Sequence, residues 1–248
     1  MMQTLNGKIC LVTGAAGGVG EAVAKRFAAM GCRVILVDIA EERLAALAAE
    51  LGDGAHALPL DISNPENIAA GLASLPEDWR AIDILVNNAG ILTNNKAAQT
   101  EPDEWRKVLS VNLDGAFYLS RAVLPAMRQK GWGRIINMCS LAMKSGGITA
   151  GTAYTTSKGA LGALTFSLAR ETAAEGITVN GIAPAHVLTP MVREQLTQAQ
   201  RDELLKIIPV RRFCEASEVA HVAAFLASPE SGFITGEIID INGGLHLD

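Results

Sequence analysis

The chain has 248 residues, of which 49% are hydrophobic and 19% charged, and its formal net charge at pH 7 is −5. This length suits one large α/β domain or two small ones, and an acidic chain without a basic run is not expected to bind nucleic acid or an anionic membrane. The four cysteines lie apart without Cys-x-x-Cys spacing, so we expect neither a metal site nor a disulfide framework. No secretory signal or membrane-length apolar run stands out, and we expect a cytoplasmic protein.

Short apolar runs alternate with helical patterns from one end of the chain to the other. Continuous apolar runs of about four to eight residues are typical of strands buried on both faces of a parallel sheet. They predict strands at 9–12, 32–37, 56–60, 82–86, 133–138, 177–182 and 236–241. Between these runs, the patterning predicts helices at 21–30, 41–51, 65–75, from Thr100 as the N-cap to about 130, from about 152 to 176, at 190–208 and at 217–227.

This alternation predicts one doubly wound (Rossmann) α/β domain over residues 1–248, with a mostly parallel seven-stranded sheet and helices on both faces. No linker-like or repetitive stretch divides it, and the polar segment at about 190–212 is expected to form a substrate lid. In such a sheet, ligands bind beyond the carboxyl ends of the strands. The residues that follow each expected strand are therefore the candidate site.

Four glycines stand within seven residues after the first expected strand. Glycine lets the backbone approach a pyrophosphate closely, and the N-terminus of the next helix offers unpaired N–H groups. The spacing is Gly-x-x-x-Gly-x-Gly instead of the commoner Gly-x-Gly-x-x-Gly, which leaves a simple tight turn as the alternative. We favour a dinucleotide site and assign to it Gly14, Gly17, Gly18, Val19 and Gly20.

Asp38 closes the second expected strand about twenty residues beyond the glycines. A carboxylate there can accept hydrogen bonds from the adenosine ribose, whereas a 2′-phosphate would meet a like charge. Neither Gly17 nor Ile39 supplies a compensating base, so the sequence predicts NAD and disfavours NADP; a solvated strand-end carboxylate is the alternative. Asp61 follows the next strand, and a helix-capping role is open for it beside adenine binding. The residues assigned to the adenosine end are Asp38, Ile39, Asp61 and Ile62.

Tyr154 and Lys158 are four residues apart in an expected helix, so their side chains share one face. A phenol has a pKa of about 10, and lowering it to about 7 takes roughly 4 kcal/mol. An ammonium about 5 Å away supplies roughly 3 kcal/mol at an effective dielectric of about 20. Lys158 is therefore expected to make Tyr154 a working acid–base, the alternative being a packed tyrosine beside a solvated lysine.

A set of short motifs occurs in order along the chain: Thr13-Gly14-x-x-x-Gly18-x-Gly20, Asn87-Asn88-Ala89-Gly90, Asn112, Ser140, Tyr154-x-x-x-Lys158 and Pro184-x-x-x-x-Thr189. Each motif is short, but the ordered set covers essentially the whole chain. It resembles the short-chain dehydrogenase/reductase family, in its branch of single-domain members of about 250 residues.

The resemblance implies a role for each matching residue. Tyr154 is expected to be the general acid–base, Lys158 to lower its pKa and hold the nicotinamide ribose, and Ser140 to orient the substrate oxygen. Asn112 is expected to hold a water in the proton path; a polar helix residue that faces solvent is the alternative. Removing a hydride from an alcohol needs a base and a hydrogen-bond donor on one oxygen, which agrees with these roles. Further cofactor contacts are expected from Asn88, Ala89, Gly90, Tyr154, Lys158, Pro184, Val187 and Thr189.

Three features depart from the family pattern. Ser140 precedes Tyr154 by fourteen residues, which makes the intervening loop one residue longer than is usual. Ala185-His186 stands where glycine is usual, and His186 is either a substrate hydrogen-bonding group or a packing side chain. Cys214 also replaces a common glycine, which affects only local loop geometry.

The substrate wall is expected from residues 92–95, 141–150, His186 and 190–208. Its polar members are Thr93, Asn94, Asn95, Ser145 and His186, and its apolar members are Leu92, Met143, Ile148 and Met191. A sugar or polyol and a 3-oxoacyl thioester are both admissible, and the polar members favour a small polar secondary alcohol or its ketone.

The sequence therefore predicts an enzyme that transfers a hydride between NAD(H) and a small polar secondary alcohol or ketone. One rival is an NADPH-dependent 3-oxoacyl thioester reductase, against which Asp38 counts. Another is a redox-sensing module that only binds NAD, against which the intact Ser140, Tyr154 and Lys158 count. The resemblance also implies a homotetramer, with the Asn112 and Tyr154 helices packing across a two-fold axis.

Overall fold

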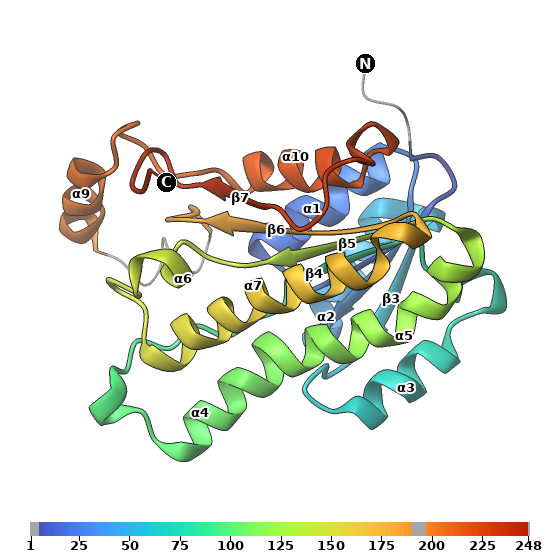
Figure 1. The fold of residues 1–248 in the computed structure, drawn as a ribbon, viewed down its shortest axis with the longest axis horizontal. Coiled ribbons are helices and arrows are strands. Elements are labelled where there is room, and N and C mark those ends of the chain that lie inside the picture. Colours follow the sequence, from blue (N-terminus) through green and yellow to red (C-terminus); the bar gives the residue numbers. More distant parts are fainter. Residues whose placement is uncertain (1–4, 190–196, 248) are drawn as a thin grey trace.

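Seven strands form one sheet in the computed structural model, which describes residues 5–189 and 197–247. Their order is β3-β2-β1-β4-β5-β6-β7, and every pairing is parallel (Figure 1). The prediction of a mostly parallel seven-stranded sheet is confirmed, and the sheet is in fact fully parallel. The strands are β1 Ile9–Thr13, β2 Arg33–Asp38, β3 Ala55–Pro59, β4 Ile84–Asn87, β5 Gly133–Met138, β6 Ile177–Pro184 and β7 Ile238–Ile241.

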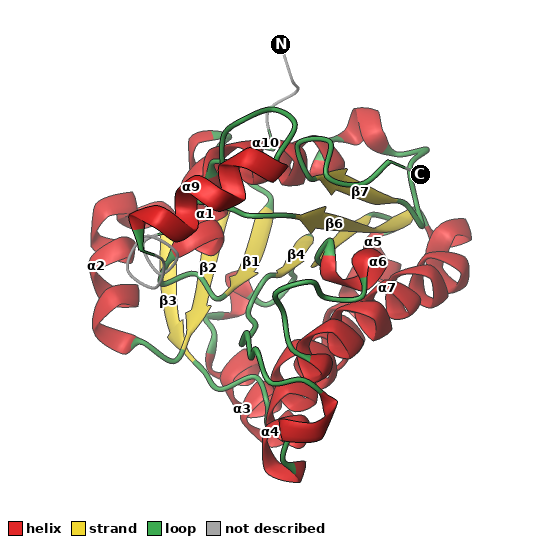
Figure 2. Cartoon of the chain, turned by 90° about the vertical axis from the view of Figure 1, so that its left-hand side faces the viewer, coloured by secondary structure: helices red, strands yellow, loops and turns green. Residues whose placement is uncertain are grey.

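Helices cover both faces of the sheet, as Figures 1 and 2 show. On one face, α1, α2 and α10 share a hydrophobic core that includes Phe27 and Leu44. On the other face, α3, α5 and α7 share a second core that includes Ile68 and Leu119. Because both faces are covered, all four residues of the central strand β4 are buried, which explains its apolar run Ile84-Leu-Val86. The strand order reverses between β1 and β4, the place where doubly wound sheets bind ligands.

The helices are α1 Gly18–Ala29, α2 Glu41–Leu51, α3 Pro65–Ser74, α4 Pro102–Leu109, α5 Gly115–Lys130, α6 Ala142–Ser145, α7 Thr152–Thr172, α9 Gln198–Ile207 and α10 Ala216–Ala227. None of these described helices is long and apolar enough to cross a lipid bilayer. The short helix α6 has no counterpart in the sequence prediction, since four residues are too few to show a period. Residues 190–196 of the expected lid lie outside the described residues.

The helix expected between Thr100 and residue 130 differs in two ways. A π-helical turn at Ser110–Asp114 separates α4 from α5. The prediction of Thr100 as the N-cap was wrong, because α4 begins at Pro102 and Glu101 occupies the cap position. The Thr100 hydroxyl instead donates to the carbonyls of Asn95 and Lys96, at 3.1 and 3.0 Å, and so closes the preceding turn.

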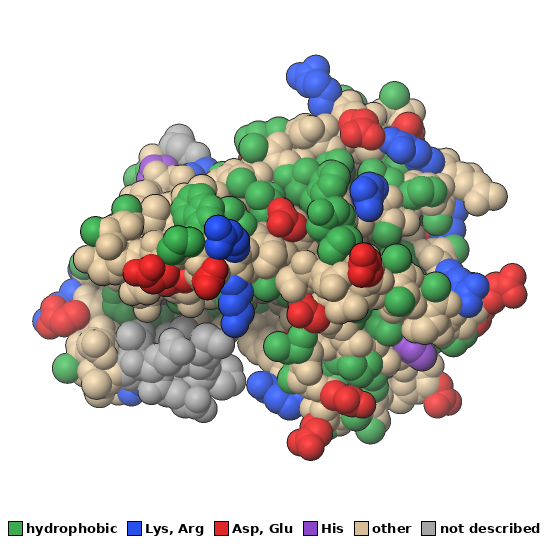
Figure 3. Space-filling view, turned by 90° about the horizontal axis from the view of Figure 1, so that it is seen from below, with side chains coloured by type: hydrophobic (Ala, Val, Ile, Leu, Met, Phe, Trp, Pro, Cys, Tyr) green, Lys and Arg blue, Asp and Glu red, His purple; other side chains and the backbone are tan. Residues whose placement is uncertain are grey.

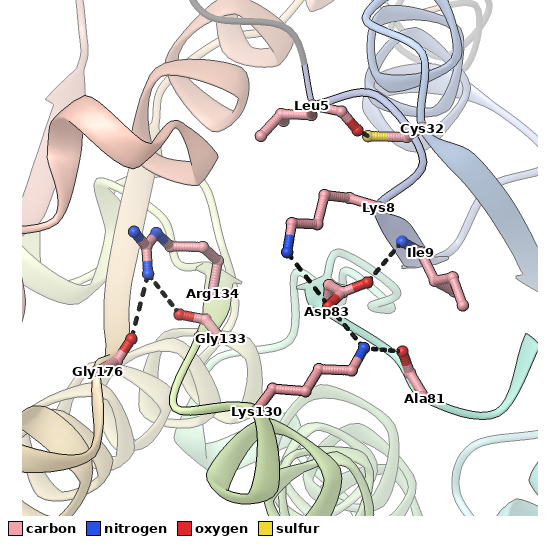
Figure 4. A network of polar contacts seen from close by, with 10 residues as sticks. All are labelled: Leu5, Lys8, Ile9, Cys32, Ala81, Asp83, Lys130, Gly133, Arg134 and Gly176. Atoms are coloured by element: carbon pink, nitrogen blue, oxygen red, sulfur yellow. Dashed lines mark hydrogen bonds and ion pairs between the residues drawn. The ribbon is translucent and has the colours of Figure 1, made fainter.

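A buried carboxylate ties the elements together at the amino ends of the strands (Figure 4). Asp83 accepts a hydrogen bond from the Ile9 N–H at 2.9 Å, and its other oxygen lies 2.7 Å from the Lys130 ammonium and 3.6 Å from that of Lys8. The Asp83 side chain is 6% exposed, whereas both lysines reach solvent. One carboxylate therefore joins β1, the approach to β4 and the end of α5.

We expect Asp83→Asn to lower the free energy of unfolding by about 2 kcal/mol, because two ammonium groups lose the charged acceptor that they share. Urea denaturation measures this difference. The matched control is Asp103→Asn, since Asp103 pairs with Arg106 through a side chain that is 98% exposed, and exposed pairs contribute little. Equal midpoints for the two variants would contradict the structural role of Asp83.

Candidate active site

A cavity of about 380 Å³ opens at the carboxyl ends of β4, β5 and β6. The three predicted catalytic residues Ser140, Tyr154 and Lys158 line it together. Asn112, the fourth, does not line it. Of the predicted cofactor residues, those that also line the cavity are Val19, Asn88, Gly90, Pro184 and Val187.

The glycines of the turn at residues 14–20, here called the glycine turn, stand where the backbone conformation or a close neighbour disfavours a side chain. Gly14 and Gly18 have φ values of 66° and 57°, in the left-handed region that favours glycine. A Cβ atom at Gly20 would overlap the Gly14 carbonyl oxygen. No side chain caps the start of α1, whose first N–H groups and positive dipole end therefore suit a phosphate. Thr189 faces this turn, with its methyl group 3.2 Å from a Cβ built on Gly18.

Thr13, at the end of β1, holds the glycine turn against the end of β4. Its buried hydroxyl oxygen accepts from the N–H groups of Asn88 and Ala89, each at 2.9 Å. The Asn88 amide in turn donates to the carbonyls of Thr13 and Gly14, at 2.9 and 3.3 Å. The sequence assigned Asn88 to the cofactor, and the structure adds that its side chain braces the turn. The sequence placed Thr13 in a motif but did not predict that its hydroxyl accepts from both of these N–H groups.

Asp38 occupies the predicted place at the end of β2. Its carboxylate accepts from the Ala16 N–H of the glycine turn and from the Ala40 N–H, both at 3.1 Å. Arg43 of α2 approaches the same turn, because a Cβ built on Gly17 would lie 2.7 Å from its Nη2 atom. The sequence argument considered bases only at Gly17 and Ile39, so it missed this cation.

The other residues assigned to the adenosine end lie differently from one another. Ile39 is 76% exposed, whereas Ile62 is 6% exposed and packs in the core beside Gly115. Only the backbone of Ile62 is therefore available to an adenine ring. The alternative role of Asp61 as a helix cap was wrong: its carboxylate accepts from the Ser63 N–H, and Asn64 caps α3.

Lys158 is buried in the wall of the cavity, so the alternative of a solvated lysine was wrong. Its ammonium donates to the Met138 carbonyl at the end of β5, at 2.7 Å, and is 5.7 Å from the centre of the Tyr154 ring. A Cβ built on Gly90 would lie 3.4 Å from this ammonium, so glycine leaves room beside it. Burial lowers the pKa of Lys158 to about 8, because the charged form loses its hydration.

The lowering of the Tyr154 pKa that was expected from Lys158 is not seen in this structure. Burial raises the pKa of Tyr154, and a hydrogen bond with the Ser140 side chain opposes that rise only in part. The Lys158 ammonium is instead committed to the Met138 carbonyl. The phenol therefore stays protonated at neutral pH, which suits a group that gives a proton to a carbonyl oxygen.

Asn112 is 1% exposed in the π-helical turn, so the alternative that it faces solvent was wrong. Its side-chain oxygen accepts from the Ile91 N–H at 2.8 Å, and its amide donates to the Ile91 carbonyl at 3.1 Å. The same amide donates to the Ser157 hydroxyl at 3.0 Å, and that hydroxyl donates to the Tyr154 carbonyl at 2.7 Å. Asn112 thus links the segment after β4 to the first turns of α7.

The substrate side of the cavity is more apolar than the sequence indicated. Thr93, Asn94 and Asn95 do not line it: the Thr93 carbonyl accepts from the Gly151 N–H, and the Asn95 amide donates to Glu104. Met143 was also misplaced, because it packs in a third hydrophobic cluster, and Met191 lies outside the described residues. Large apolar residues that line the cavity include Leu92, Leu141, Ile148, Leu204, Ile207 and Leu245.

His186 lines the same cavity in an unusual backbone conformation. Its φ is 45°, a value that costs free energy in a residue with a side chain. The imidazole meets the Phe213 ring edge-on, with centroids 6.5 Å apart, and burial lowers its pKa. The ring is therefore neutral at pH 7 and keeps both a donor and an acceptor. Across the described residues, no three His, Cys, Asp or Glu side chains gather where they could hold a metal ion.

Comparison with known proteins agrees with this geometry. Residues 14–246 match a family model described as Enoyl-(Acyl carrier protein) reductase. The chain is 40% identical to the 3-oxoacyl-[acyl-carrier-protein] reductase of Vibrio cholerae over 246 residues, which cover 99% of this chain and 100% of that protein. The fold and these matches define an oxidoreductase that uses a nicotinamide cofactor. Within that class, the chain belongs to the short-chain dehydrogenase/reductase family.

Two solved structures from Brucella melitensis superpose on nearly the whole chain. One is described as a short-chain dehydrogenase/reductase, glucose/ribitol dehydrogenase, with a TM-score of 0.92, 35% identity and complete coverage of both chains. The other is a 3-ketoacyl-(acyl-carrier-protein) reductase complexed with NADH, with a TM-score of 0.92, 32% identity, and coverage of 98% of this chain and 100% of that one.

We expect Tyr154→Phe to lower kcat by about 10²–10⁴-fold, because the variant cannot transfer the proton that accompanies hydride transfer. Affinity for the nicotinamide cofactor should stay close to that of the unaltered chain, as cofactor fluorescence can measure. The other tyrosine of the chain supplies the control: Tyr118 packs near Phe117 and Arg121, and Tyr118→Phe should retain activity. Turnover by Tyr154→Phe at the unaltered rate would refute the acid–base assignment.

We expect Lys158→Met to abolish activity without loss of stability at pH 7. Burial lowers the pKa of Lys158 from 10.5 to about 8, so between these values the unfolded chain binds more protons than the folded chain. The Lys158 contribution to the free energy of unfolding therefore rises with pH across this window, and falls as pH drops through about 8. The difference between the two chains, measured by urea denaturation from pH 7 to 10, should follow that rise. A constant difference would contradict the burial cost.

Proposed function

We propose that this protein is a reductase of 3-oxoacyl thioesters that uses NADH. The observation that carries the proposal is the apolar wall beside the Ser140 and Tyr154 hydroxyls, to which Leu92, Ile148 and Leu204 contribute. Hydroxyl groups of a sugar against such a wall would lose their hydrogen bonds to water without replacement, whereas an acyl chain would gain by burial. This replaces the small polar substrate favoured from sequence. The 3-oxoacyl reductase named among the relatives supports the same class.

The side chains of this chain supply everything but the hydride, which the nicotinamide carries. The Ser140 hydroxyl would donate a hydrogen bond to the ketone oxygen, and the Tyr154 hydroxyl would give that oxygen its proton. The Lys158 ammonium lies in the same wall, where it would hold the nicotinamide ribose. Oxidation of the 3-hydroxyacyl product reverses each transfer, with Tyr154 as the base.

The dinucleotide fits the residues that surround the glycine turn. Gly14 and Gly20 have no space for a side chain, the start of α1 lacks a side-chain cap, and Asn88 and Gly90 continue the same surface into the cavity. We assign Asp38 to the adenosine ribose hydroxyls, which favours NADH over NADPH. The Arg43 guanidinium beside Gly17 weakens this preference, since it offers a positive charge to a 2′-phosphate. The NADH complex of the Brucella melitensis reductase is consistent with this choice.

We also propose that four copies assemble, with α4, α5 and α7 packing across a two-fold axis. Each of these helices carries an exposed aromatic residue: Trp105, Phe117 and Phe166 are 36%, 40% and 51% exposed. Figure 3 views the side of the molecule formed by α3, α4 and α5 and shows hydrophobic side chains between its charged groups. Aromatic side chains are enriched in protein–protein interfaces, which supports this choice of face.

We expect 3-oxooctanoyl-coenzyme A to be reduced with a kcat/KM at least tenfold above that for a ketose such as fructose, since several buried CH₂ groups contribute about 0.8 kcal/mol each. NADH and NADPH oxidation, followed spectroscopically, measures both substrates with both cofactors. Faster reduction of the ketose would return the assignment to a polyol dehydrogenase. Cofactor binding without turnover of either substrate would favour the NAD-sensing module.

The preference for NADH over NADPH is tested separately at Asp38. Asp38→Ala removes the carboxylate that excludes the 2′-phosphate, and it should raise affinity for NADPH relative to NADH. If the unaltered chain already binds NADPH more tightly, the assignment of Asp38 is wrong and Arg43 dominates that end of the site.

A further inference from the structure

The segment that joins β5 to α7, residues 141–151, forms one wall of the cavity and is here called the substrate loop. Residues 147–150 of this loop line the cavity, and the loop connects Ser140 to the helix that carries Tyr154. It contains two consecutive glycines, Gly146 and Gly147, both with φ of 73°. Glycine is the residue with the greatest backbone freedom, so the loop has little intrinsic stiffness. Contacts from outside must hold it.

Lys96 supplies those contacts to the tip of the substrate loop. Its ammonium lies 2.6 Å from the Gly147 carbonyl oxygen, 2.7 Å from that of Ala150 and 3.5 Å from that of Ile148. An ammonium has three N–H donors, and all three have acceptors in this one loop. Hydrogen bonds from a charged donor are stronger than those between neutral groups. One side chain therefore holds three backbone carbonyls of the loop together.

The segment that carries Lys96 is itself fixed at both ends. The Gly151 N–H donates to the Thr93 carbonyl at 2.7 Å, and the Thr152 N–H donates to the Asn95 carbonyl at 3.0 Å, so backbone contacts hold the base of the loop. On the other side, the Asn95 amide donates to Glu104 of α4 at 2.6 Å. Lys96 thus connects the tip of the loop to a segment that is itself anchored to α4.

From these contacts we propose that Lys96 is a positioning residue that fixes the substrate-facing wall of the cavity and thereby sets affinity for the carbonyl substrate. The inference rests on the site described under the proposed function, and it does not depend on which carbonyl compound that site reduces. Lys96 is not among the residues that line the cavity, and its ammonium donates to backbone carbonyls of the substrate loop. Its effect should therefore fall on substrate binding and leave cofactor binding and the chemical step intact.

Lys96→Met keeps the aliphatic stem and removes the three donors. We expect KM for the carbonyl substrate to rise at least tenfold, with kcat nearly unchanged and with cofactor affinity unchanged. Lys25→Met is the matched control, because it removes the same charge from α1, where the ammonium pairs with Glu21 and Glu50 outside the cavity. Unchanged KM in Lys96→Met, or equal losses of substrate and cofactor affinity, would overturn the proposal.

A second measurement keeps the inference testable if the proposed reaction fails. Amide hydrogen exchange across residues 141–152 requires no substrate, and Lys96→Met should accelerate it while Lys25→Met leaves it unchanged. If thioesters are not reduced but another carbonyl compound is, KM for that compound serves equally. Unaltered exchange in Lys96→Met would show that the backbone contacts at the base suffice and that Lys96 positions nothing.

Discussion

An ammonium buried without a carboxylate partner is the constraint on which the arrangement of this site depends. Within the described part of the chain, Lys158 has no ion pair, and its one hydrogen bond goes to the carbonyl that ends β5. Burying such a group is costly because its charged form loses hydration, and for this reason its pKa falls to about 8. The site tolerates this cost because parallel strands bring their ends to one edge, where a carbonyl of β5 and the glycine at position 90 meet the same helix face.

The strands and the glycine turn could be predicted from sequence because their causes are local. A strand covered on both faces must be apolar throughout, and a turn with φ near 60° at Gly14 and Gly18 requires glycine. The Ser140, Tyr154 and Lys158 group was also predictable, since strand ends and a four-residue helical spacing determine it. The pKa shifts of these residues were not predictable, because the hydrogen-bond partner of Lys158 is a backbone carbonyl twenty residues away. A sequence shows which side chains are near in a helix but not which backbone groups compete for them.

The remaining predictions from local sequence failed because tertiary contacts determine those positions. Threonine is a common helix N-cap, but the Thr100 hydroxyl instead closes the turn before the helix. The polar residues Thr93 and Asn95 indicated a polar substrate wall, yet they bind the base of the substrate loop and α4. The wall is instead completed by Leu204 and Leu245, which lie more than a hundred residues from Leu92 in the chain. No pattern in the sequence connects such positions, nor Arg43 with Gly17 or Lys96 with the loop.

The participation of Leu245 in the cavity wall has a practical consequence for handling the protein. The two ends of the chain lie apart in Figure 1, with the C-terminal end on the side of α9 and the N-terminal end above the opposite end of the sheet. An affinity tag at the C-terminal end would begin within a few residues of Leu245 and so close to the cavity, whereas one at the N-terminal end would be remote from it. Purification tags and surface-immobilisation linkers therefore belong at the N-terminal end, away from Leu245 and the cavity that it lines.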